Sequence, residues 1–86
     1  MGTVESQMLD YIKKRHVEGA LSVTKEEIVN AVVQNDPRFR NSSALFYGLR
    51  RLRLRYLVNA VDAPDGTTHY FIGSYPSADL RKSLGL

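Results

Sequence analysis

Six arginines lie within residues 37–57, and this stretch contains no Asp or Glu. The planar guanidinium of Arg suits phosphate oxygens and guanine edges better than the ammonium of Lys does. The segments on either side are slightly acidic, although the whole chain has a formal net charge of +3. We therefore expect the stretch to bind a polyanion. Its six cations are Arg38, Arg40, Arg50, Arg51, Arg53 and Arg55.

Catalytic and metal chemistry have few candidates. The chain has no cysteine and two histidines, and its six glycines are too scattered to form a phosphate-binding loop. His69 lies near Asp62 and Asp65 in the sequence, but strand alternation separates neighbouring side chains, and aspartates beside a turn commonly form the turn itself. No nucleophile is paired with a base. We expect a protein that is not an enzyme and that uses no metal or cofactor.

A helix predicted over residues 41–57 positions most of the arginines. Its apolar residues recur at helical spacing on one face; they are Leu45, Leu49, Leu52 and Tyr56. The opposite face carries Ser43, Tyr47, Arg50 and Arg51, with Arg53 and Arg55 on its flanks. A helix of this length spans about 25 Å, enough to cross a DNA major groove about 12 Å wide. The pattern predicts a recognition helix, although a basic face can also serve solubility alone.

The arginines are expected to differ in role. Arg50 and Arg51 point into the groove and read bases. Arg38 and Arg40 precede the helix, where a chain that passes the edge of a duplex meets phosphates. Arg53 lies near the buried face, so we expect its side chain to extend past the core and to matter less. Between these groups lie three polar residues that can cap the helix, Asn41, Ser42 and Ser43.

Composition is that of one small globular domain. The chain has 86 residues, of which 43% are hydrophobic and 24% charged. No apolar run is long enough to span a membrane, and the N-terminus lacks the layout of a signal peptide. We expect a cytoplasmic protein with no membrane partner, associated with the nucleoid if the source is bacterial, archaeal or viral.

Two helices are predicted before the basic stretch. The first runs from about Thr3 to His16, buries Val4, Met8 and Ile12 at i, i+4 and i+8, and ends at Gly19. Residues 21–23 are apolar at alternate positions and predict a short strand. Residues 24–27 then form a capping box that opens a second helix, which ends near residue 35. The box explains the adjacent acids Glu26 and Glu27 without any catalytic role.

A hairpin and a short helix are predicted after the basic stretch. Residues 58–62 and 67–72 read as strands around a turn at 63–66. Residues 73–76 break the second strand, and Ser77 can cap a final helix that carries Leu80 and Leu84. We expect residues 1–76 to form the main domain, with residues 77–86 as a tail packed on it. The leucine pair either packs back on the same chain or forms a homodimer contact.

This succession resembles the winged helix-turn-helix family over residues 4–72, with an α+β fold. Residues 21–23 match the first strand, 24–29 the opening of the second helix, 43–57 the third helix and 58–72 the wing. The resemblance implies DNA binding, with the third helix in the major groove and the wing against the backbone or minor groove. On the wing, Thr67, Thr68 and His69 could donate to that backbone.

The expected function is DNA binding by a small transcription regulator or a nucleoid-type architectural protein, with double-stranded DNA as the partner. The residues expected to contact DNA are Arg38, Arg40, Asn41, Ser42, Ser43, Tyr47, Arg50, Arg51, Thr67, Thr68 and His69. The alternative is a winged-helix module that docks on another protein. A wing with no Lys or Arg favours that alternative, and so does Leu54, which lies near the supposed DNA face.

Overall fold

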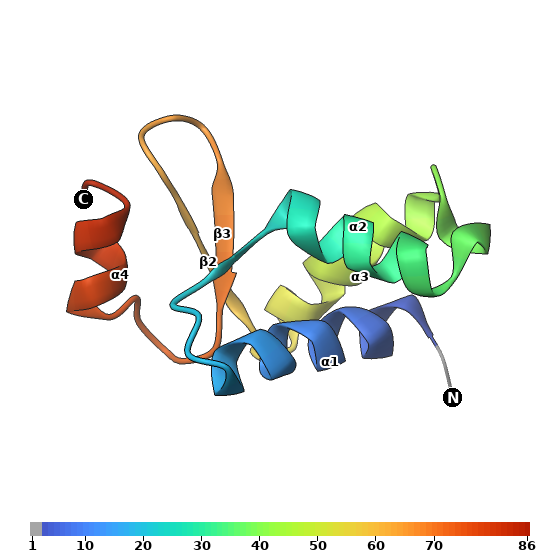
Figure 1. Ribbon diagram of the computed structural model, residues 1–86, viewed down its shortest axis with the longest axis horizontal. Coiled ribbons are helices and arrows are strands. Elements are labelled where there is room, and N and C mark those ends of the chain that lie inside the picture. The colour runs from blue at the N-terminus through green and yellow to red at the C-terminus, as the bar shows by residue number, and fades with distance from the viewer. Residues whose placement is uncertain (1–2) are drawn as a thin grey trace.

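A computed structural model describes residues 3–86 as helices packed beside one sheet (Figure 1). The elements are α1 (Val4–Val17), β1 (Val23–Thr24), α2 (Lys25–Asn35), the 3-10 turn η1 (Pro37–Phe39), α3 (Ser43–Leu54), β2 (Asn59–Asp62), β3 (Thr68–Phe71) and α4 (Ala78–Ser83). The strands form one antiparallel sheet in the order β1-β3-β2. This is the predicted α+β class, and the order of its elements is compatible with a winged helix.

Hydroxyl side chains begin each of the four α-helices. Thr3 accepts a hydrogen bond from the backbone N–H of Ser6 at 3.2 Å, and Thr24 accepts one from Glu27 at the same distance. Ser77 caps α4 in the same way. These three predicted caps are confirmed, and Ser42 is the one among three candidates that caps α3. Each cap satisfies a first-turn N–H that has no partner within its own helix.

The core lies where α1, α2 and α3 meet the sheet. The predicted faces of α1 and α2 are confirmed, because Met8, Ile12, Ile28 and Val32 are all buried. Helix α3 packs closely on α1 at Gly48. A Cβ atom added there would lie 3.1 Å from Met8 Sδ and 3.2 Å from a methyl carbon of Val4.

The sheet is shorter than the sequence suggests. β1 covers Val23 and Thr24 rather than residues 21–23, and Leu21 is exposed. The predicted hairpin is present, with its turn closed by a hydrogen bond from the N–H of Gly66 to the carbonyl of Ala63 at 3.0 Å. Gly66 has a φ of +90°, which suits glycine better than any residue with a side chain. The tip of the hairpin extends beyond the helices (Figure 1).

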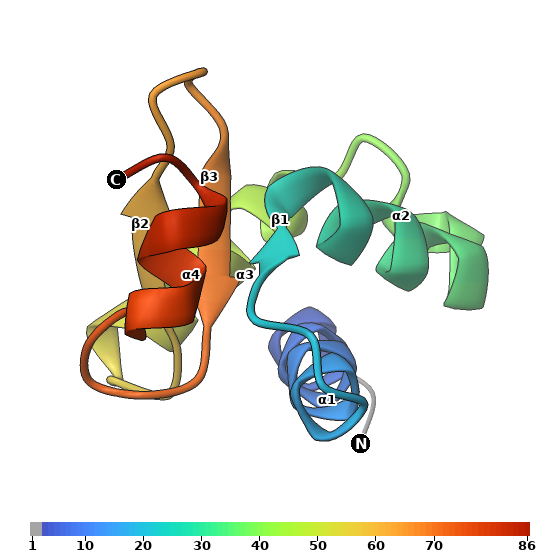
Figure 2. The same cartoon turned by 60° about the vertical axis from the view of Figure 1, so that its left-hand side comes forward.

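Helix α4 lies on the other side of the sheet from α1, α2 and α3, as the two views agree (Figures 1 and 2). Leu80 is buried there, whereas Leu84 is half-buried and Leu86 is half exposed. Burial of Leu80 within one chain fits the expectation that this stripe packs back on its own domain. A homodimer through the C-terminal segment stays a prediction and would rest on Leu84 and Leu86.

The prediction that Tyr56 belongs to the buried face of the third helix is wrong. Helix α3 ends at Leu54, and Tyr56 follows with a φ of +58° and an exposed fraction of 88%. Its N–H bonds the carbonyl of Arg53 at 3.0 Å, and the N–H of Leu57 bonds the carbonyl of Leu52 at 3.1 Å. This pattern ends many helices, usually with glycine in the left-handed position. The helix therefore ends before its register reaches Tyr56.

We expect Tyr56→Gly to raise the free energy of unfolding by about 1 kcal/mol, because a left-handed conformation is unfavourable for any residue with a Cβ. Urea denaturation would measure the change. Asn41→Gly is the matched control, since Asn41 has a φ of +59° but asparagine tolerates this region well. A Tyr56→Gly variant less stable than the wild type would show that the ring contributes packing energy.

Candidate nucleic-acid interface

The exposed side of α3 divides into a front and two flanks. The front, opposite the buried leucines, carries Ser43, Tyr47, Arg50 and Leu54, and all four are exposed. At 100° per residue, Arg53 lies on the flank that Arg50 borders, whereas Arg51 and Arg55 lie on the other. The two flanks have different neighbours in the fold, so the arginines of α3 are not equivalent.

Arg51 and Arg55 are both paired with Glu5 of α1. The Nε of Arg51 donates to Glu5 Oε1, and the Nη1 of Arg55 lies 3.1 Å from Glu5 Oε2. The two arginines thus share one carboxylate, which leaves one net positive charge on this flank. Helical spacing predicts that Arg51 lies on the front beside Arg50, but this pairing turns Arg51 towards α1.

On the opposite flank, cations and aromatic rings line an open groove of about 450 Å³ between α3, the start of α2 and the sheet. Its lining includes Lys25, Phe46, Arg50, Arg53, Tyr56 and Tyr70. Among residues 3–86, no carboxylate lies within 4 Å of the guanidinium groups of Arg50 or Arg53. We call this feature the cationic groove.

The sequence does not predict a binding role for two members of the cationic groove, Lys25 and Phe46, and it predicts only a minor role for Arg53. The sequence indicates Lys25 only as part of the capping box and indicates no role for Phe46. The structure places the Nζ of Lys25 5.5 Å from the centroid of the Phe46 ring. The sequence predicts that the side chain of Arg53 extends past the core and matters less. It is exposed, as such a side chain would be, and it lines the groove with Arg50. The signal available in the sequence for such a surface was the spacing of Phe46 and Arg50, which lie four residues apart, about one helical turn.

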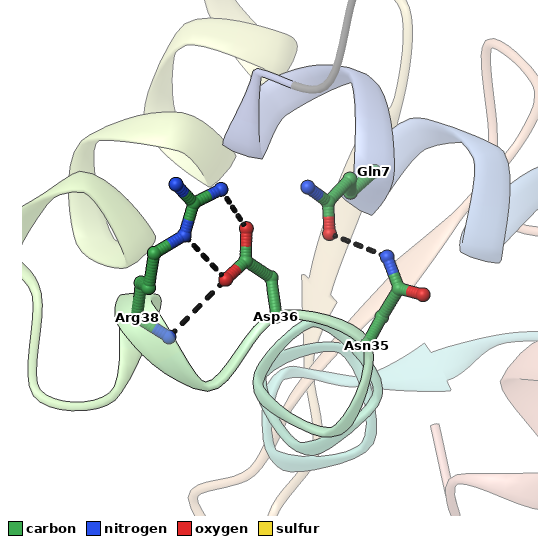
Figure 3. Close-up of polar contacts among 4 residues, drawn as sticks. All are labelled: Gln7, Asn35, Asp36 and Arg38. Atoms are coloured by element: carbon green, nitrogen blue, oxygen red, sulfur yellow. Dashed lines mark hydrogen bonds and ion pairs between the residues drawn. The ribbon is translucent and has the colours of Figure 1, made fainter.

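The link before α3 holds Arg38 in an ion pair (Figure 3). The carboxylate of Asp36 accepts from the Nε of Arg38 at 2.9 Å, from its Nη2 at 2.7 Å and from its backbone N–H at 3.2 Å. Asn35 donates to Gln7 of α1 at 3.1 Å, which ties the end of α2 to the first helix. Arg40, by contrast, is exposed, and among residues 3–86 no carboxylate lies within 4 Å of it.

The hydrogen bonds from Arg38 hold the pKa of the Asp36 carboxyl below its ordinary value. Because the folded-state pKa is lowered, this interaction stabilises the fold fully above about pH 4 and is lost as the pH falls through the lowered pKa. We expect Arg38→Ala to raise the pKa of Asp36, as an NMR titration of the side-chain carboxyl would measure. Arg40→Ala is the control, and equal shifts in both variants would contradict a specific pair.

The expected donors on the wing already have partners. Thr68 donates to Asp62 at 2.8 Å, and Thr67 donates to Asp65 at 2.6 Å. His69 lies between two hydroxyls, with its Nε2 2.9 Å from Thr67 and its Nδ1 3.1 Å from the Oγ of Ser22. Contact with a phosphate would therefore compete with hydrogen bonds inside the hairpin.

The remaining candidate residues lie at the start of α3 and on its front. Ser43 and Tyr47 share the front with Arg50, whereas the hydroxyl of Ser42 is engaged in the cap. Asn41 is exposed and left-handed. The structure thus brings Ser43, Tyr47 and Arg50 onto one surface and sets Arg38, Arg51 and the wing residues apart from it.

Comparisons with protein-family models, curated proteins and solved structures found no match. In the part of the chain from residue 3 onwards, no helix is long and apolar enough to cross a membrane.

Proposed function

We propose that this protein binds double-stranded DNA as a winged-helix domain, with α3 in the major groove. The observation that carries the proposal is that Arg50 and Arg53 are exposed and uncompensated on a helix whose opposite face is core. Such cations are costly to gather in one place unless a polyanion neutralises them. A helix with one face fixed in the core can present them in a constant geometry.

The dimensions and chemistry of α3 agree with this role. Its 12 residues span about 18 Å, which exceeds the width of a major groove of about 12 Å. Ser43, Tyr47 and Arg50 would face the base edges, while Lys25, Arg40 and Arg53 would lie near phosphates. A single module of this size suits a small transcription regulator or a nucleoid-type architectural protein of the cytoplasm.

Binding of a fluorescein-labelled duplex, followed by anisotropy over a range of salt concentrations, tests the proposal. If Lys25, Arg40 and Arg53 each neutralise one phosphate, the logarithm of affinity should fall with the logarithm of salt concentration with a slope of about −3. Equal slopes and affinities for random and genomic duplexes would indicate an architectural binder. Absence of binding at low salt would overturn the proposal.

One observation favours a second function, docking on another protein. Leu54 lies near the centre of the front with an exposed fraction of 67%, and Phe46 and Tyr47 are exposed about two turns earlier on the same helix. Aromatic residues are enriched in protein interfaces, and an apolar centre with a charged rim is typical of them. If no duplex binds at low salt, this becomes the leading function.

A further inference from the structure

The cationic groove combines two kinds of surface that duplex binding does not need together. Phe46 and Tyr56 expose 55% and 88% of their surfaces, and both line the groove with Lys25, Arg50 and Arg53. We propose that this groove binds an unpaired, single-stranded segment of nucleic acid. At least one base stacks on Tyr56 or Phe46, while Arg50 and Arg53 hold the flanking phosphates. This inference deepens the proposed function and rests on one part of it, that the exposed side of α3 binds nucleic acid.

The conformation of Tyr56 is the first support. The left-handed position that ends a helix is usually glycine, because a Cβ is unfavourable there. Packing of the ring against the fold could offset the cost of this backbone conformation. However, Tyr56 is the most exposed large hydrophobic residue among residues 3–86, so its ring contributes little packing. The hydrogen bonds that end α3 require a left-handed residue at this position but not a tyrosine, so the exposed ring points to a contact made outside the fold.

The arrangement around Phe46 is the second support. Its ring meets the ring of Tyr47 edge to face, with the centroids 5.4 Å apart, and the ammonium of Lys25 lies 5.5 Å from its centroid. These neighbours restrain the ring, yet more than half of it faces solvent. A restrained, exposed ring with a cation beside it can stack a base and hold the adjoining phosphate.

The chemistry of the groove favours unpaired bases over paired ones. In a duplex the base faces are covered by their neighbours, and only polar edges and the thymine methyl reach the grooves. Phenylalanine has no donor or acceptor with which to read those edges. An unpaired base exposes its whole face, and stacking on an aromatic side chain is then available to any base. Three cations around the rings complement the phosphates between successive bases.

The test compares four labelled probes by anisotropy with the full chain: a blunt duplex, the same duplex with a single-stranded tail, the same duplex with an abasic tail, and the tail alone. The abasic tail carries the same phosphates without bases, so it separates stacking from charge. Two variants each remove one ring, Tyr56→Gly and Phe46→Ala. Tyr75→Ala is the matched control, because Tyr75 has an exposed fraction of 85% and lies outside the groove lining.

We expect the duplex with the base-containing tail to bind more tightly than the blunt duplex. The abasic tail should add only the affinity that its phosphates provide. Tyr56→Gly or Phe46→Ala should weaken tail binding about 5- to 150-fold, the range for loss of one stacked base. Both variants should bind the blunt duplex within about twofold of wild type, because the stacking contact is absent there. Tyr56→Phe should restore tail binding, and Tyr75→Ala should not change it.

The outcomes separate this inference from the proposed function. In one outcome the blunt duplex binds, the tail adds no affinity and neither variant changes the affinity. That outcome overturns the single-strand inference, while duplex binding stands. If the tail alone binds but the blunt duplex does not, the inference stands and the duplex proposal falls. No binding to any probe overturns both. Displacement of the tail by a Glu-rich peptide as effectively as by an unlabelled tail would assign the groove to an acidic protein and overturn the inference.

Discussion

Leu52→Ala is expected to lower the free energy of unfolding by about 2–5 kcal/mol, because Leu52 is 1% exposed and its removal leaves a cavity between α3 and the rest of the core. Leu54→Ala is the matched control. It makes the same substitution on the same helix, but Leu54 is 67% exposed, so its effect should stay within about 0.5 kcal/mol.

Urea denaturation of both variants, followed by circular dichroism, would measure the difference. Helix propensity cancels between them because each replaces Leu by Ala within α3. Similar losses in the two variants would mean that the register of α3 is rotated and that its front is not the surface described above.

Arg50→Ala and Arg53→Ala are each expected to weaken DNA binding by about 1–3 kcal/mol, whereas Arg51→Ala should cost less than about 1 kcal/mol. The reason is the difference in pairing. Arg51 donates to Glu5, which it shares with Arg55, so part of its charge is already compensated within the fold. No carboxylate among residues 3–86 lies within 4 Å of Arg50 or Arg53, so both can be neutralised by DNA.

Anisotropy titrations at several salt concentrations would measure these losses, with melting temperatures to show that each variant folds. The three substitutions are identical and lie within one turn of one another, so differences between them report position alone. An Arg51→Ala loss equal to that of Arg50→Ala would show that the pair with Glu5 opens on binding. Unchanged affinity in both Arg50→Ala and Arg53→Ala would overturn the role of α3.

Much of the fold could be predicted because its determinants are local. Apolar spacing in α1 and α2, the capping threonines and the turn closed by Gly66 each depend on residues a few positions apart. The prediction for Tyr56 failed where a helical pattern continued past the end of the helix. Periodicity alone could not show that Arg55 would cap α3 and that Tyr56 would become left-handed.

The candidate site was less predictable because its charges are set by distant residues. Glu5 meets Arg51 across 46 positions of sequence, so a stretch that reads as six uncompensated arginines is compensated in part by α1. The pairing of Asp36 with Arg38 is local, because the two residues lie two positions apart in the sequence. Lys25 and Phe46 meet only because the fold brings the start of α2 to one flank of α3, which composition could not indicate.

The close approach of α1 and α3 limits how this sequence can change over evolutionary time. At position 48 a methyl group would have to displace Met8 Sδ and a methyl of Val4 by a few tenths of an ångström, and a branched side chain would require the helices to separate. Separation would also carry Glu5 away from Arg51 and Arg55. We expect relatives of this protein to keep glycine, or at most alanine, at position 48, while the exposed positions 47 and 54 on the same helix vary freely unless binding constrains them.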